Sequence, residues 1–286
     1  MSMRFDVAVV GSVNLDFVIC TKTLPTAGET LGNGSFLTTP GGKGANQALA
    51  AQRLGANTKL YAAVGADPYA DEALVNLRED GVDLSSLRVL SDIASGAAFV
   101  NVDDNGENQI AVASGANNAL SADGFDAIDA TWVIAQLEVP TDVILAAAQR
   151  RTGYFCLNAA PAQSLDVAIF DLTDMLVVNE VEWEFYRSAL SNYTGDIVLT
   201  LGAKGAVLLR DGDEIARAHA PKVDVVDTTG AGDTFVGGLV TAMIAGMASE
   251  KALQWACCCG ALATAQLGAQ ASIPYRDDVQ RLFDAQ

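Results

Sequence analysis

Short runs of apolar residues recur along the chain, and most of them end at a glycine or a polar turn. The first run, Phe5–Gly11 (FDVAVVG), is almost continuously apolar, which is typical of a strand covered on both faces. Further strands of this kind are predicted at Lys59–Val64, Thr131–Gln136, Tyr154–Leu157, Met175–Val178 and Ile197–Leu201. Apolar residues at helical spacing predict helices at Gly44–Leu54, Asp67–Glu79, Thr141–Arg151, Val181–Leu190, Ala231–Ala245 and Glu250–Leu267. This alternation predicts an α/β fold, with a mostly parallel central sheet flanked by helices.

A second group of segments alternates apolar and polar residues and does not fit the strand–helix order. These segments are Val13–Cys20, Phe36–Thr38, Gly96–Val102 and Asn108–Ala113. The last two are joined by a turn that contains Asn105-Gly106, which favours a hairpin. We therefore predict a small separate sheet, formed by residues from about 13–38 and 94–113 and inserted into one domain that spans 1–286. A further hairpin is predicted at 206–210 and 214–219.

Composition and charge narrow the possible functions. Half of the 286 residues are apolar and 18% are charged, as in a globular protein with a sizeable core. A net charge of −18 disfavours nucleic acids and anionic membrane surfaces as partners. A small anion can still bind locally, because backbone N–H groups at the start of a helix attract negative charge.

Cysteine, histidine and hydropathy exclude other classes of protein. The five Cys form no C-x-x-C pair, and the odd number makes a poor disulfide framework. With His219 as the only histidine, a site with two or three His ligands cannot form within one chain. The uncharged stretch 252–275 is rich in Gln, Ala and Gly, so a helix in the core is favoured over a membrane span. No targeting segment is recognisable, and we expect a cytoplasmic protein.

One glycine-rich segment connects an apolar run to a helix and carries an acidic residue. It reads Val225-Val226-Asp227-Thr228-Thr229-Gly230-Ala231-Gly232-Asp233-Thr234-Phe235. Its small residues let backbone N–H groups converge on an anion at the positive end of the helix dipole. Asp233 falls in the first helical turn, where a carboxylate would repel a phosphate. Two interpretations remain open: Asp233 removes a proton from an attacking hydroxyl, or it only stabilises the helix start.

Another glycine-rich segment, Pro40–Gln47 (PGGKGANQ), also precedes a helix. It lacks the spacing of a P-loop. Its glycines allow a ligand to approach the backbone, and Lys43 and Asn46 offer contacts to hydroxyl groups; a simple tight turn is the alternative. Asn14 and Asp16 alternate on one face of a predicted strand. This pair suits a polyol, although a solvated strand face is also possible.

The two glycine-rich segments together resemble the signatures of the ribokinase-like (phosphofructokinase-B-type) carbohydrate kinases. The matching stretches are GGKGANQA at 41–48 and DTTGAGDTF at 227–235. Shorter matches follow in order along nearly the whole chain, at 11–16, 114–117, 136–138, 179–182, 200–205 and 268–272. The resemblance implies a ribokinase-like fold whose small sheet closes over a sugar and pairs two subunits into a homodimer.

The resemblance also implies the chemistry and the residues that perform it. It implies ATP-dependent phosphorylation of the primary hydroxyl of ribose, with Asp233 as the general base. Gly230, Ala231 and Gly232 match the anion hole. The implied sugar contacts are Asn14, Asp16, Gly41, Gly42, Lys43, Asn46, Glu138 and Asp233. The implied nucleotide contacts are Asn179, Glu182, Thr200, Gly202, Ala203, Lys204, Gly205, Gly232 and Cys257.

Two cations are implied as well. Glu182 matches an acid that helps to position Mg²⁺ and phosphate through water. An activating K⁺ is implied at Asp227, Thr229, Ala263, Gln266, Gly268 and Ser272, held mainly by carbonyl oxygens. The alternatives to ribose are fructose, 2-keto-3-deoxygluconate or a nucleoside as acceptor. A non-catalytic sugar-binding relative is the alternative to an enzyme.

Overall fold

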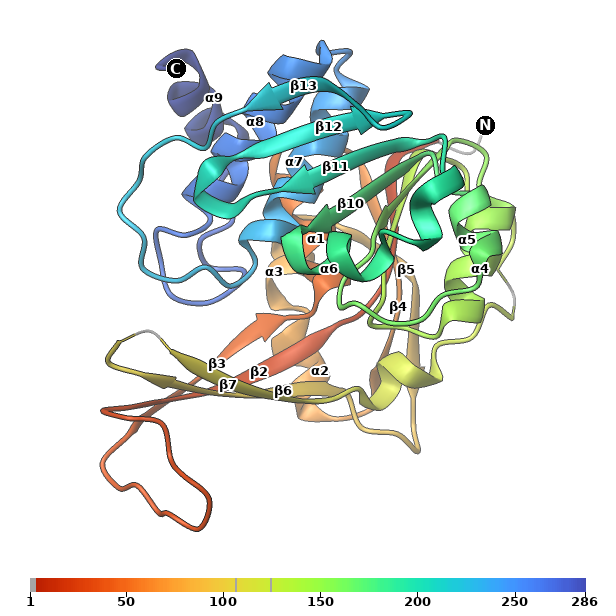
Figure 1. Ribbon diagram of the computed structural model, residues 1–286. Helices are drawn as coiled ribbons and strands as arrows, with labels where there is room; N and C mark the ends of the chain where they lie inside the picture. Colours follow the sequence, from red (N-terminus) through yellow and green to blue (C-terminus); the bar gives the residue numbers. More distant parts are fainter. Residues whose placement is uncertain (1–3, 106, 124) are drawn as a thin grey trace.

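The computed structural model describes residues 4–105, 107–123 and 125–286, and it contains a large sheet and a small one (Figure 1). The strand order of the large sheet is β13-β12-β11-β10-β9-β8-β1-β4-β5. Neighbours from β11 to β5 are parallel, β12 is antiparallel to β11, and β13 is antiparallel to β12. Its strands are β1 (Phe5–Val10), β4 (Thr58–Gly65), β5 (Asp83–Leu90), β8 (Ala130–Gln136), β9 (Tyr154–Asn158), β10 (Met175–Asn179), β11 (Asp196–Thr200), β12 (Ala206–Arg210) and β13 (Asp213–Ala218).

Helices cover both faces of the large sheet. They are α1 (Lys43–Arg53), α2 (Pro68–Ala73), α3 (Val75–Glu79), α4 (Thr141–Arg150), α5 (Val167–Asp171), α6 (Glu180–Tyr186), α7 (Ala231–Ile244), α8 (Ser249–Leu262) and α9 (Arg276–Asp284), with 3₁₀ turns η1 (Gly115–Ala119), η2 (Ala189–Asn192) and η3 (Gly202–Lys204). Alternate residues of a strand face opposite sides, so β1 divides the core into two. Val7 and Val9 pack in the cluster that contains α1, α7 and α8, whereas Ala8 and Val10 pack in the cluster of α4, α5 and α6. The predicted α/β architecture is confirmed.

The small sheet projects from the main body (lower left in Figure 1). Its strands are β2 (Asn14–Thr21), β3 (Ser35–Gly41), β6 (Gly96–Asp103) and β7 (Asn108–Ala113), in the order β3-β2-β6-β7. The separate sheet built from two insertions is confirmed, and β6 and β7 pair as the predicted hairpin. Gly106, in the turn of that hairpin, lies outside the described residues. The assignment of 1–286 to one domain stays a prediction.

Some elements differ from the sequence prediction. β5, α5 and α9 were not predicted; β5 is half-exposed at the sheet edge and contains two serines, so its apolar signal is weak. The helix predicted at 250–267 ends at Leu262, because the Thr264 carbonyl accepts hydrogen bonds from the N–H groups of Val226 and Asp227 instead. The helix predicted at 67–79 is divided at Leu74. Within the described residues, no helix combines the length and apolar character needed to cross a membrane.

The start of α1 packs directly on the turn after β1, and this contact requires a glycine at position 44. A Cβ on Gly44 would lie 2.5 Å from the carbonyl carbon of Gly11 and 2.5 Å from the nitrogen of Ser12. We expect Gly44→Ala to lower the free energy of unfolding by about 1–3 kcal/mol, because backbone atoms must move. Denaturant unfolding measures the change. Gly32→Ala is the control, since nothing lies within 4 Å of its Cβ, and an equal loss in both variants would contradict this packing argument.

Candidate active site

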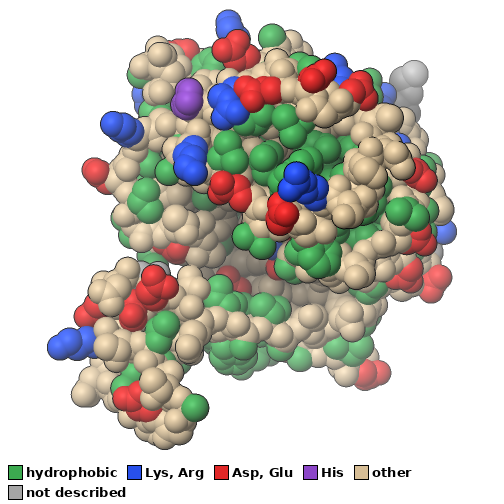
Figure 2. Space-filling view, viewed as in Figure 1, with side chains coloured by type: hydrophobic (Ala, Val, Ile, Leu, Met, Phe, Trp, Pro, Cys, Tyr) green, Lys and Arg blue, Asp and Glu red, His purple; other side chains and the backbone are tan. Residues whose placement is uncertain are grey.

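A cavity of about 490 Å³ lies between the small sheet and the main body, where the surface is hollowed (Figure 2). Strands β2, β6 and β7 form one side, and α1, the start of α7 and the loop before it form the other. Most of the predicted sugar contacts line this cavity: Asn14, Asp16, Gly42, Lys43, Asn46, Glu138 and Asp233. Gly41 does not line it but lies against the Asp16 carboxylate. The structure therefore brings together polar groups from positions 14 to 233 of the chain.

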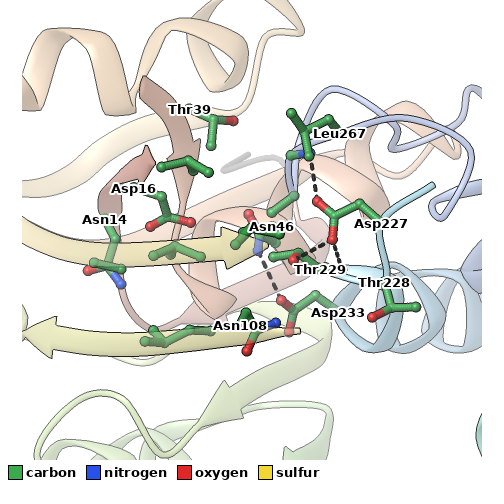
Figure 3. Close-up of a pocket in the computed structure, with 18 of the residues that line it drawn as sticks. Asn14, Asp16, Thr39, Asn46, Asn108, Asp227, Thr228, Thr229, Asp233 and Leu267 are labelled. Carbon is green, nitrogen blue, oxygen red and sulfur yellow. Dashed lines mark hydrogen bonds between the residues drawn. The ribbon is translucent and has the colours of Figure 1, made fainter. Parts of the chain in front are cut away.

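Asp233 lies in the first turn of α7, buried to 5% exposure, and its carboxylate accepts two amide hydrogen bonds. The Asn46 side chain donates to Oδ2 at 2.9 Å, as drawn in Figure 3, and the Gln47 side chain donates to Oδ1 at 3.0 Å. Both donors come from the first turns of α1, which packs against α7. The carboxylate is thus fixed at the cavity wall, where a bound hydroxyl group can reach it.

Lys43 and Glu138 form a second polar group in the same cavity. The Glu138 carboxylate accepts hydrogen bonds from the Ser12 hydroxyl at 2.5 Å and from the backbone N–H of Lys43 at 3.1 Å. The Asp233 carboxylate raises the pKa of Lys43. Burial acts in the opposite direction, whereas Glu138 and Glu182 raise this pKa further. Among the described residues that line the cavity, Lys43 is the only cation. Its positive charge therefore stands against the carboxylates of Asp16, Glu138, Asp227 and Asp233 in the same cavity.

Asn14 is oriented by Asn117, which follows the small sheet in the chain. The Asn117 side chain donates to Asn14 Oδ1 at 2.7 Å and accepts from the backbone N–H of Val13 at 2.9 Å. The oxygen of Asn14 is therefore occupied, and its N–H groups are left to donate to a ligand oxygen. Asp16 lies two residues further along the same strand and faces the same cavity (Figure 3). Together the pair offers a donor and an acceptor to a polyol.

Asp16 titrates near neutrality because of its surroundings. Burial, followed by repulsion from Glu138 and Asp233, raises the pKa of Asp16 to about 7 from the usual 3.8. The folded chain therefore holds a proton at Asp16 that the unfolded chain releases, so stability falls as the pH rises from about 4 to about 7.

We accordingly expect Asp16→Asn to stabilise the ligand-free protein at pH 8, by on the order of a few kcal/mol, and to change little at pH 4. The same variant loses sugar affinity, because the ionised acceptor is gone. Thermal unfolding of both proteins across this pH range tests the claim. An equal difference in stability at pH 4 and pH 8 would contradict it.

A second cavity, of about 610 Å³, lies on the other side of the start of α7 and is mainly apolar. Predicted nucleotide contacts that line it are Asn179, Thr200, Gly202, Ala203, Gly205, Gly232 and Cys257. Glu182 and Lys204 do not line it. Glu182 instead forms a capping box with Asn179 at the start of α6, and burial raises its pKa. Lys204 is exposed beside Glu180.

The predicted anion hole lies where the two cavities meet. Gly230 lines the first cavity, Gly232 lines the second, and Val225 and Thr228 line both. Gly230 caps α7 with a φ of 76°, a conformation that favours glycine. The backbone N–H of Ala231 donates to the Thr228 carbonyl at 3.2 Å, whereas among the described residues no such acceptor takes the N–H of Gly232. Of these two N–H groups, only that of Ala231 is therefore already engaged within the described part of the chain.

The residues predicted to hold K⁺ lie next to the anion hole. Asp227 accepts hydrogen bonds from the backbone N–H and hydroxyl of Thr229 and from the N–H of Gly268 (Figure 3). The carbonyl oxygens of Ala263 and Gly268 both lie within hydrogen-bond distance of the Ser272 hydroxyl, which can donate its one proton to either, so these two oxygens converge. The side chain of Gln266 is exposed. Within the described part of the chain, no group of three or more His, Cys, Asp or Glu residues is arranged to hold a metal ion.

Residues 4–276 match the pfkB family of carbohydrate kinases. The chain belongs to this family. It is 34% identical to ribokinase of Haemophilus influenzae over an alignment of 306 positions that covers 99% of each chain. Among solved structures, Thermotoga maritima ribokinase superposes with a TM-score of 0.89 at 30% identity, covering 99% of this chain and 100% of that one. Arabidopsis thaliana ribokinase, solved with ribose and ATP, superposes with a TM-score of 0.86 at 29% identity, covering 98% and 99%.

Besides the residues that the sequence analysis singled out, the cavity and its hydrogen bonds involve several others. Ser12 joins Glu138 to the start of α1, and Gln47 binds Asp233. Thr39, Asn105 and Asn108 add polar groups to the first cavity from the small sheet. Gln47 stands inside the GGKGANQA stretch, which was a usable signal. Thr39, Asn105 and Asn108 stand in no comparable motif.

Proposed function

We propose that this chain is a kinase that transfers the γ-phosphoryl group of ATP to the primary hydroxyl of ribose, giving ribose 5-phosphate. The observation that carries the proposal is the position of Asp233. Its carboxylate lies at the wall of a polar cavity suited to a sugar, one residue from the Gly232 backbone that lines an apolar cavity suited to a nucleotide. The ribokinases to which the chain is similar, one of them solved with ribose and ATP, support the choice of both substrates.

The chemistry follows from the groups at the junction of the two cavities. Asp233 accepts the proton of the sugar hydroxyl while the oxygen of that hydroxyl attacks the γ-phosphorus of ATP. The bond between the γ-phosphorus and the oxygen that bridges it to the β-phosphorus breaks, and ADP leaves. The N–H of Gly232 and the positive end of α7 stabilise charge on the transferred group, and Lys43 offsets the neighbouring carboxylates. Asn14, Asp16, Asn46 and Glu138 hold the sugar hydroxyls. The small sheet excludes water when it covers the sugar, which prevents hydrolysis of ATP.

We propose Mg²⁺ and K⁺ as the cations. The described residues contain no group of three or more His, Cys, Asp or Glu side chains that could hold a metal ion. Mg²⁺ would therefore be held mainly by phosphate oxygens and water, with Glu182 nearby, and it would neutralise phosphate charge. The converging carbonyls of Ala263 and Gly268, with Asp227, suit K⁺, which would order the anion-hole loop. Replacing K⁺ by tetramethylammonium is expected to lower kcat, and an unchanged kcat would contradict the K⁺ proposal.

A panel of acceptors tests the proposed substrate. ADP release is measured with ribose, 2-deoxyribose, fructose, 2-keto-3-deoxygluconate and adenosine, each with ATP and Mg²⁺. We expect the highest kcat/KM for ribose. A higher value for another acceptor would overturn the assignment of ribose but keep the chemistry, whereas binding of ribose and ATP without turnover would indicate a non-catalytic sugar-binding protein.

We also propose a homodimer that forms through the small sheet. β7 is exposed along its whole length, and Phe36 on β3 and Phe99 on β6, which both stack on Phe17 of β2, are more than half exposed on the face away from the cavity. Exposed aromatic residues gathered on one face of a sheet are typical of an interface. Sedimentation of the wild type and of Phe99→Asp tests this: we expect a dimer that the variant weakens, and a wild-type monomer would contradict it. The cytoplasmic location stays a prediction.

A further inference from the structure

Gln47 is a fully buried polar residue in contact with Asp233. Its exposure is 0%, and it lines neither cavity, so its side chain does not face a ligand. Burying an amide is costly unless all its groups form hydrogen bonds. The role of Gln47 must therefore be read from its hydrogen bonds inside the protein.

Those hydrogen bonds fix the orientation of the amide. The Gln47 nitrogen donates to Asp233 Oδ1 and to Asn158 Oδ1, both at 3.0 Å. Its oxygen accepts from the Gln136 side chain at 2.5 Å. Gln136 and Asn158 end the adjacent strands β8 and β9 of the rigid central sheet. With the oxygen held by Gln136, the nitrogen has to face Asp233.

The carboxylate of Asp233 stands among charges of both signs. Its negative charge contributes to raising the pKa of Asp16 on β2, of Lys43 on α1 and of Glu182 on α6, and Glu138 lines the same cavity. Hydrogen bonds donated to a carboxylate favour its ionised form. Two such bonds come from neutral amides, those of Asn46 and Gln47. Asn46 also lines the sugar cavity, whereas Gln47 does not.

We infer that Gln47 is a positioning residue, which holds the carboxylate of Asp233 aimed at the acceptor hydroxyl. This inference rests on the proposed function, because it assumes that Asp233 is the general base. Gln47 connects that base to the C-terminal ends of two interior strands of the large sheet through Gln136 and Asn158. It acts on the rate of phosphoryl transfer through Asp233 and not on the binding of either substrate.

Gln47→Met tests the inference, because methionine has a similar length and cannot donate a hydrogen bond. We expect kcat with ribose to fall about 10- to 100-fold, the loss expected for a hydrogen bond to a charged group. The KM values for ribose and ATP should stay within about threefold. The acidic limb of the pH profile of kcat should move up by about one pH unit. Gln52→Met is the matched control: it lies on the same helix, and its side chain accepts a hydrogen bond from Thr58 away from the site.

Gln47→Glu gives a sharper signature. Two carboxylates about 3 Å apart cannot both ionise at neutral pH, so they would share one proton. We expect the acidic limb to move up by about two pH units or more, with activity recovering as the pH rises. Gln136→Met removes the hydrogen bond that orients the Gln47 amide. It should shift the acidic limb of the kcat profile in the same direction, but by less. These two variants test the inference even where Gln47→Met does not fold.

A double-mutant cycle completes the test. In an Asp233→Asn background, Gln47→Met should cause no further loss of kcat, because its effect passes through Asp233. An equal loss in both backgrounds, or an unchanged kcat and pH profile in the single variant, would overturn the inference. Failure of the proposed function would be seen separately, as an absence of ribose-dependent ADP release by the wild type.

Discussion

Asp233→Asn is expected to lower kcat with ribose by about 10²- to 10⁴-fold, the range that a positioned general base contributes. Asparagine keeps the shape of the side chain but cannot accept the hydroxyl proton. The dissociation constants of ribose and an unreactive ATP analogue should change by less than about threefold, because most contacts remain. Steady-state kinetics and calorimetric titration of the same samples measure the two effects.

The hydrogen bonds at Asp233 require one further measurement. The carboxylate accepts N–H groups from both Asn46 and Gln47, so an asparagine amide turns its own N–H₂ toward one of these donors. Thermal unfolding therefore has to accompany the kinetics, to separate lost chemistry from lost structure. Asp71→Asn is the control, since Asp71 is exposed and pairs with Arg78 on the surface. A folded Asp233→Asn variant with nearly normal kcat would contradict the assignment of the base.

Lys43→Met is expected to lower kcat by about 10²- to 10³-fold, comparable to the loss of one donor that stabilises transition-state charge. Lys43 is the only cation among the described residues lining the cavity, which also contains Asp16, Glu138, Asp227 and Asp233. Without it, the phosphoryl group meets these carboxylates with less compensation. The KM for ribose should rise as well. Steady-state kinetics at several ribose and ATP concentrations measures both changes.

The control for Lys43→Met is Lys251→Met, which makes the same change of charge on the exposed surface of α8. If the two variants behave alike, net charge rather than position explains the loss. If Lys43→Met changes neither kcat nor KM, Lys43 does not supply the local positive charge proposed for it.

The central sheet was predictable because its signals are local. Apolar runs such as Phe5–Gly11 identify buried strands without any knowledge of their neighbours. The strand β5 was not predicted, because it lies half-exposed at the edge of the sheet. Its sequence, DLSSLRVL, therefore lacks a continuous apolar run. The small sheet was recognised from its different pattern and from the Asn-Gly turn. Its strand order, in which β2 pairs with β6 over a long stretch of chain, was not accessible from the sequence.

Site residues that stand in a sequence motif were predicted, whereas residues whose role depends on a contact with a distant part of the chain were missed. Asp233 and Asn46 stand in the two glycine-rich segments, yet their hydrogen bond joins residues 187 positions apart. Gln136 and Asn158 end two strands whose apolar patterns say nothing of a polar network. The engagement of the Ala231 N–H with the Thr228 carbonyl depends on the backbone path before α7. Such features follow from packing rather than from residue type.

The most direct test of the account is a crystal structure with ribose and an unreactive ATP analogue bound together. We predict the sugar between the small sheet and α1, with its primary hydroxyl at hydrogen-bond distance from the Asp233 carboxylate and in line with the γ-phosphate. The phosphate should lie at the start of α7, next to Gly232. A ribose bound with that hydroxyl pointing away from Asp233, or a γ-phosphate away from the start of α7, would contradict the account.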